Sequence, residues 1–175
     1  MSEQTPEHTL PRLVEARKLV AVEARFKRKV AAADLVRLGE SSISIDDVEV
    51  DVRFGRDEQG RPTLSGELTA NIALQCQRCL EPMPFSASKN VRLALVWDEA
   101  QGKALPKDLE PWIVGEGEAD LIEIVEEEIL LLLPVVARHD HDCLDLSALD
   151  QGVAPEQTSD KQNPFSVLAD LNLKK

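Results

Sequence analysis

The run Leu64-Ser-Gly-Glu-Leu-Thr-Ala-Asn-Ile-Ala-Leu-Gln-Cys76 decides the fold. Its apolar residues fall mostly at even positions, which is typical of a β-strand with one face on a core and the other in water. Residues 43–54 and 85–97 have the same alternation. The 175-residue chain therefore contains three successive strands with no segment between them long enough for a crossover helix, which favours antiparallel pairing.

Local signals around these strands refine the prediction. Residues 56–62 have the Gly and Pro content of a turn, and the pair Asp46-Asp47 shifts the alternation by one residue, as a β-bulge does. Residues 20–30 alternate as well and predict a further half-buried strand. The sequence thus predicts an antiparallel meander that can curl into a partial barrel.

One strong helix follows the strands. Apolar residues recur at helical spacing from Leu121 to Leu133 before Pro134, and Asp120 stands at capping-box spacing from Glu123. Its glutamates at positions 123, 126 and 127 are expected to face water, and the run 126–128 is interpreted as a solvated helix face. Shorter helices are predicted at residues 13–19, at 31–38 with Gly39 as the C-cap, and from residue 163 onward.

The predicted fold class is α+β: an antiparallel meander or partial barrel, one main amphipathic helix, and short N- and C-terminal helices. The length suits one domain. We expect a disordered N-terminus at residues 1–11, a single domain at 12–136, a flexible acidic segment at 137–162, and a short helix with a tail at 163–175.

Charge is distributed unevenly along the chain, whose net charge is −12. Residues 12–37 carry eight Lys or Arg against three acids, whereas residues 98–160 carry seventeen acids against three bases. An acidic protein repels nucleic acid in general, so any RNA contact is expected at Arg25, Lys27, Lys29 and Arg78. The acidic half suits a basic protein partner or serves solubility alone.

The three cysteines include a pair, Cys76 and Cys79, at metal-ligand spacing. A tetrahedral zinc site needs two further ligands, and Cys143 with His139 or His141 could supply them. The alternative is that Cys76 is a core residue and the other two are free thiols. A thioredoxin-like redox function is disfavoured, because residues 80–84 predict a turn into a strand instead of a helix.

No catalytic constellation is visible, so we expect a binding protein and not an enzyme. The chain lacks the nucleophile-elbow, metalloprotease, Walker and dinucleotide-binding motifs, and no small-molecule substrate is expected. The apolar runs are too short to cross a bilayer, and residues 1–11 do not resemble a signal peptide. A cytoplasmic protein without membrane contact is therefore expected.

Several of these segments together resemble the YceD family, known as large ribosomal RNA subunit accumulation proteins. The central resemblance is Leu74-Gln-Cys-Gln-Arg-Cys-Leu80. Downstream, it continues in residues 120–121, 126–130 and 133–136, in His139-Asp140 followed by Cys143, and in Asn163-Pro-Phe-Ser-Val-Leu168. The resemblance covers nearly the whole chain, because it also extends weakly into the N-terminal region.

The resemblance implies a non-catalytic accessory role in the synthesis or accumulation of large-subunit ribosomal RNA. The implied partner is a large-subunit ribosomal protein or the precursor RNA, and no catalytic residue is carried over. Some relatives have additional cysteines in the C-terminal half, which favours a metal there. This chain has only Cys143 in that half, so a full site would need a histidine. The alternative function is a zinc-binding or redox-responsive regulator that uses Cys76 and Cys79.

Overall fold

The computed structural model describes residues 9–144 of the chain. Contacts divide the chain into two units, Met1–His141 and Asp142–Lys175, and the fold described below belongs to the first. The helix predicted from residue 163 lies outside the described residues. None of the described helices is both long enough and apolar enough to span a membrane.

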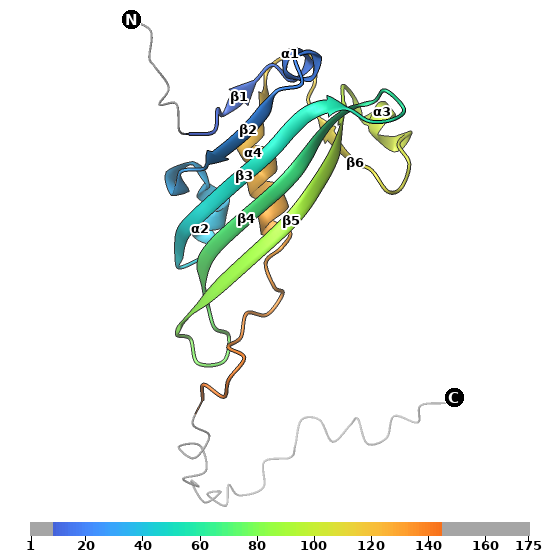
Figure 1. The fold of residues 1–175 in the computed structure, drawn as a ribbon. Coiled ribbons are helices and arrows are strands. Elements are labelled where there is room, and N and C mark those ends of the chain that lie inside the picture. Colours follow the sequence, from blue (N-terminus) through green and yellow to red (C-terminus); the bar gives the residue numbers. More distant parts are fainter. Residues whose placement is uncertain (1–8, 145–175) are drawn as a thin grey trace, which may run out of the picture. The chain divides into compact units, whose positions relative to one another are not determined.

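A five-stranded sheet forms most of the first unit (Figure 1). Its strands lie in chain order, and the first four pair antiparallel, which confirms the predicted meander. The fifth strand pairs parallel to the fourth and was not predicted. The sheet does not close into a barrel among the described residues, and the strands are β2 (Arg25–Lys29), β3 (Ser44–Arg56), β4 (Pro62–Gln75), β5 (Pro82–Val96) and β6 (Glu110–Ile113).

Short helices and a second small sheet complete the unit. In the small sheet, β1 (Leu13–Val14) pairs antiparallel with β7 (Ala119–Asp120). The main helix, α4 (Leu121–Leu130), follows β7 directly. The remaining helical segments are α1 (Ala16–Ala21), the 3₁₀ turn η1 (Ala32–Asp34), α2 (Val36–Glu40) and α3 (Glu99–Lys103).

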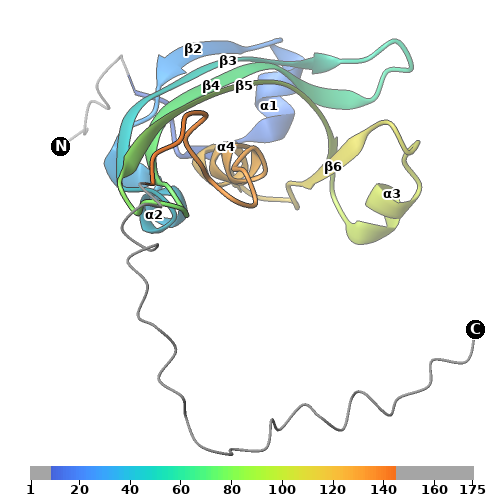
Figure 2. The same ribbon diagram turned by 90° about the horizontal axis from the view of Figure 1, so that it is seen from below.

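The core lies between the concave face of the sheet and α4, which crosses that face (Figure 2). The even-numbered apolar residues of β3 and β4 point into it, and Phe54, Leu68 and Ile72 are at most 1% exposed. Ile129 of α4 is equally buried. The strand alternation and the helical spacing in the sequence thus describe two faces of one core.

Two local predictions are confirmed. The register between β3 and β4 shifts between Ile45 and Asp47, at the predicted bulge. The Asp120 carboxylate accepts the backbone N–H of Glu123 at 2.9 Å, so Asp120 caps α4 as its spacing indicated. A polar side chain at this position satisfies one of the free N–H groups of the first helical turn.

Three element boundaries were predicted wrongly. In place of the helix expected at residues 13–19, residues 13–14 form β1 and α1 begins at Ala16. The strand expected from residue 20 starts at Arg25, because α1 runs to Ala21 and Glu23 adopts a turn with φ 48°. Gly39 does not end the second helix but lies inside α2. The hydroxyls of Ser41 and Ser42 donate to the carbonyls of Arg37 and Leu38. These serines satisfy the C-terminal carbonyls in place of a glycine cap.

Candidate functional site

The turn between β4 and β5 holds the Cys-x-x-Cys pair. Cys76 follows the last residue of β4, is fully buried, and donates its N–H to the carbonyl of Glu81 at 2.9 Å. Leu80 donates its N–H back to the carbonyl of Cys76 at 2.9 Å and has a positive φ of 64°. This tight turn between antiparallel strands has no helix after it, unlike the helix N-terminus on which thioredoxin-like chemistry depends.

The segment after α4 contacts this turn. Gln77 donates its N–H to the carbonyl of Ala137 at 2.8 Å. The Arg78 guanidinium contacts the carbonyls of His139 and His141. His139 therefore lies beside the turn although it is about sixty residues away in sequence. Local sequence signals cannot reveal this contact, which depends on backbone groups.

Three donor atoms meet at this point. The sulfurs of Cys76 and Cys79 and a ring nitrogen of His139 all lie within 4.8 Å of one another. The Nδ1 atom of His139 is 3.5 Å from the Cys79 sulfur, and its Nε2 is 3.3 Å from the carbonyl oxygen of Pro82. With the proton on Nε2 donated to that carbonyl, Nδ1 presents its lone pair on the side of the Cys79 sulfur. Metal-ligating histidines are commonly oriented in this way.

The Cys76 sulfur is in an environment that favours the thiolate. Backbone N–H groups, that of Cys79 first and then those of His139 and Arg78, lower the pKa of Cys76 to about 5, although burial opposes the shift. Thiolates, and not thiols, bind metals. Cys143 follows His139 by four residues and belongs to the second unit.

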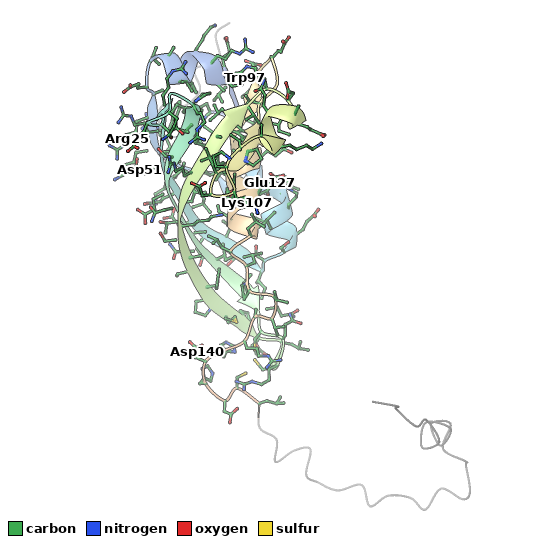
Figure 3. All side chains as sticks on the ribbon, turned by 90° about the vertical axis from the view of Figure 1, so that its right-hand side faces the viewer. Arg25, Asp51, Trp97, Lys107, Glu127 and Asp140 are labelled. Carbon is green, nitrogen blue, oxygen red and sulfur yellow. The ribbon has the colours of Figure 1, made fainter. Side chains whose placement is uncertain are left out.

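Three of the four cations predicted to contact RNA lie on β2, on the outer face of the sheet, and are paired within the chain. Arg25 binds both carboxylate oxygens of Asp51 at 2.8 Å, and the two side chains lie together in Figure 3. Lys27 is 3.8 Å from Asp51. These contacts raise the pKa of Arg25, mainly through its hydrogen bond to Asp51, and lower that of Asp51.

Lys29 is paired too, and Arg78 is not part of the same surface. The Lys29 ammonium lies 2.9 Å from Asp47 and 3.4 Å from Glu49, and hydrogen bonds to these two acids raise its pKa. Arg78 instead lies in the β4–β5 turn. The predicted RNA contacts are therefore divided between the outer face of β2 and the cysteine turn.

Two glutamates of α4 were expected on a water-exposed face, and the structure corrects this. Glu126 and Glu128 are each only 5% exposed. Glu126 is 3.0 Å from the Nε of Arg37, and Glu128 is 2.5 Å from the Nζ of Lys89. Glu127, between them, is exposed as expected and lies 3.4 Å from Arg37. Helical spacing alone could not identify partners on α2 and β5.

Comparison with known proteins defines the class of the chain. The model of the family described as large ribosomal RNA subunit accumulation protein YceD matches residues 64–172. The chain belongs to this family. It is similar to the large ribosomal RNA subunit accumulation protein YceD of Haemophilus influenzae, with 39% identity over 150 residues, covering 82% of this chain and 85% of that protein. No solved structure matches the chain.

Proposed function

We propose that the protein is a non-catalytic factor in the accumulation of large-subunit ribosomal RNA and that it acts by binding. The observation that carries this proposal is the similarity to YceD over most of the chain. The role is exercised in the cytoplasm, where thiols remain reduced. The sequence indicates two candidate binding partners: a basic large-subunit ribosomal protein and the precursor RNA.

The pairing of the β2 cations favours the protein partner. A phosphate would have to displace Asp51 from Arg25 and Lys27, and Asp47 from Lys29. Such competition reduces the gain that normally comes from releasing counterions on nucleic-acid binding. The net charge of −12 also disfavours RNA binding, because it repels a polyanion. We therefore propose that the protein holds a basic ribosomal protein.

A native pull-down of the full chain, with and without ribonuclease, tests this proposal. The expected result is a large-subunit ribosomal protein that remains bound after ribonuclease treatment. Recovery of precursor RNA alone, lost on ribonuclease treatment, contradicts it.

A triple variant separates the two routes. Replacing Arg25, Lys27 and Lys29 with Gln should leave capture of the ribosomal protein unchanged. A matched variant replaces Lys18, Lys103 and Lys107, three exposed cations away from β2, with Gln. If only the β2 variant loses its partner and shows a shallower salt dependence, the RNA route is correct.

We also propose a second property, binding of one structural zinc ion by Cys76, Cys79, His139 and Cys143. The first three donors are within 4.8 Å of one another, which suits a tetrahedral site after small side-chain movements. Four residues of chain span at most about 14 Å, so Cys143 stays within reach of His139. Three thiolates and one imidazole form a typical structural zinc set. The bound ion would tie the segment after α4 to the β4–β5 turn.

Metal analysis of the purified full chain tests the zinc proposal. We expect one zinc per chain, and cobalt substitution should give a sulfur-to-cobalt charge-transfer absorption band. Cys79→Ser and Cys143→Ser should each weaken binding, whereas His141→Ala, a change to a neighbouring histidine outside the proposed ligand set, should not. A chain without zinc after expression in zinc-containing medium, and without a cobalt spectrum, contradicts the proposal and leaves the cysteines as ordinary thiols.

A further inference from the structure

One long stretch of the sheet edge has no neighbouring strand among the described residues 9–144. β6 pairs only with Leu93–Val96 of β5. The preceding part of β5, from Pro82 to Val91, pairs with β4 on one side only. At about 3.4 Å per residue, this stretch is long enough to accept a complete further strand.

The register shows which groups point to the open side. β4 and β5 pair without a shift from Thr63 and Ala94 to Gln75 and Pro82, so backbone directions alternate regularly along β5. The carbonyl of Glu81 faces β4, because it accepts the N–H of Cys76. That of Val96 faces β6, because it accepts the N–H of Val114. Even-numbered residues of β5 therefore direct their N–H and C=O to the side of β6.

Three residues of the stretch consequently present both a donor and an acceptor to the open side: Ser86, Ser88 and Asn90. No hydrogen bond joins these backbone groups to another described residue on that side. Pro82 and Pro84 have no N–H and blunt one end of the edge. Their position at the first residues of β5 leaves the central part open to pairing.

The opposite edge of the sheet, formed by β2, is protected against strand addition. β2 is bordered by the residues before β1: Thr9 bridges to Lys29, and Leu10 donates its N–H to the carbonyl of Lys29. The β2 side chains are mostly charged, which discourages strand addition. β5 has uncharged Ser86, Ser88 and Asn90 on its outer face instead.

We infer that the open edge of β5 pairs antiparallel with β5 of a second copy of this chain. Pairing around Ser88 sets Ser88 against Ser88 and Ser86 against Asn90 in both directions, which forms about six backbone hydrogen bonds. The contact ends where Pro84 faces Arg92, because β6 occupies the edge from Leu93 onward.

The concave side of the edge also gains from this pairing. Met83, Phe85 and Ala87 of β5 point to that side and are only partly buried within one chain. A neighbouring β5 covers more of their apolar surface. The repulsion between two chains of charge −12 is weakened because salt screens exposed charges beyond about 8 Å at physiological ionic strength.

The oligomeric state of the full chain tests this inference. Light scattering coupled to size-exclusion chromatography should show a dimer for the wild type and for Ser88→Ala. Ser88→Pro removes an N–H that points to the open side and leaves the bonds to β4, so it should give a monomer with an unchanged circular dichroism spectrum. A wild-type monomer at all concentrations, or a dimer that Ser88→Pro leaves intact, overturns the inference.

Amide hydrogen exchange keeps the test decisive if Ser88→Pro fails to fold. In the wild type, exchange at Ser88 and Asn90 should slow as protein concentration rises, because these N–H groups become bonded in the dimer. The amide of Val22, an exposed residue after α1, should show no such dependence. Concentration-independent exchange at Ser88 and Asn90 overturns the inference independently of any variant.

Discussion

The carboxylate of Glu126, on α4, accepts the backbone N–H of Leu38, on α2, at 3.0 Å. Leu38 is fully buried, and Glu126 is 5% exposed. The second carboxylate oxygen binds Arg37 at 3.0 Å. A single side chain thus satisfies a buried N–H of α2 and joins the two helices.

Removal of this carboxylate should be costly. We expect Glu126→Ala to lower the free energy of unfolding by about 3 kcal/mol, because it leaves the N–H of Leu38 without a partner inside the protein. Urea unfolding at neutral pH measures the loss. The neighbouring variant Glu127→Ala removes a half-exposed carboxylate and should cost less than about 1 kcal/mol. Equal decreases in the free energy of unfolding of the two variants would show that the buried contact of Glu126 contributes no more than the exposed contact of Glu127.

A second buried ion pair allows a double-mutant test. Lys89 of β5 and Glu128 of α4 lie 2.5 Å apart, with side-chain exposures of 26% and 6%. Lys89→Met leaves a buried carboxylate without its cation and should cost about 3 kcal/mol.

The double variant Lys89→Met/Glu128→Leu should recover most of this loss, because it removes both charges and adds apolar contacts. Calorimetric or urea unfolding of the wild type, Lys89→Met, Glu128→Leu and the double variant provides the cycle. If the double variant is less stable than Lys89→Met, the pair does not behave as a coupled unit.

These glutamates illustrate where sequence reasoning reaches its limit. The spacing of Leu121, Val125 and Ile129 predicts the apolar face of α4, and Asp120 predicts its start. The partners of Glu126 and Glu128 come from α2 and β5, which are distant in sequence. Helical periodicity separates only an apolar face from a polar face. It therefore predicts that charged residues such as these two glutamates face water.

The sheet shows the same division between local and distant information. The alternation in β3, β4 and β5 predicts the meander, because each strand pairs with its sequence neighbour. β6 has only four residues, begins Glu110-Pro111, and forms no local hairpin. Its parallel pairing follows from α3, which returns the chain to the edge of β5, and no alternation marks so short a strand.

The candidate metal site was also only partly accessible from the sequence. Cys76 and Cys79 are recognisable by their spacing. His139 was one of two candidate histidines, and the backbone contact between Gln77 and Ala137 brings its segment to the turn. Such contacts involve groups that every residue carries, so side-chain identity does not reveal them.

The position of Gly66 on β4 allows a separate prediction about stability. Its φ is 155°, and a Cβ atom there would lie 2.0 Å from the carbonyl oxygen of Asp51 on β3. We expect Gly66→Ala to cost on the order of 3 kcal/mol or more, because rigid backbone must move. Thermal unfolding followed by circular dichroism measures this loss.

The control for Gly66 is Gly39, which lies inside α2, where an added Cβ atom would meet nothing within 4 Å. Gly39→Ala should stabilise the protein by about 0.5 to 1 kcal/mol, since alanine favours a helix interior. A Gly66→Ala protein as stable as the wild type would contradict the close approach of β3 and β4.

The β3–β4 hairpin provides a prediction of pH dependence. Burial by itself would raise the pKa of Asp57, but the N–H and guanidinium of Arg61 and the N–H of Gln59 outweigh it and lower the pKa below its usual value. The bonds to these three donors are 2.8, 2.6 and 3.0 Å long. Asp57 therefore stabilises the fold as a carboxylate.

The direction of the effect follows from this lowered pKa. The folded protein holds the Asp57 proton less tightly than the unfolded chain, in which an aspartate has a pKa of about 3.9. The stabilisation by Asp57 is therefore fully present above about pH 4 and is lost as the pH falls through the folded-state value. Asp57→Asn should lower the urea midpoint at neutral pH, and the difference from wild type should shrink below about pH 4. Glu99→Gln, at an exposed i,i+4 pair with Lys103, should leave the midpoint nearly unchanged at neutral pH. A difference between Asp57→Asn and wild type that persists undiminished at low pH would contradict stabilisation by the ionised carboxylate.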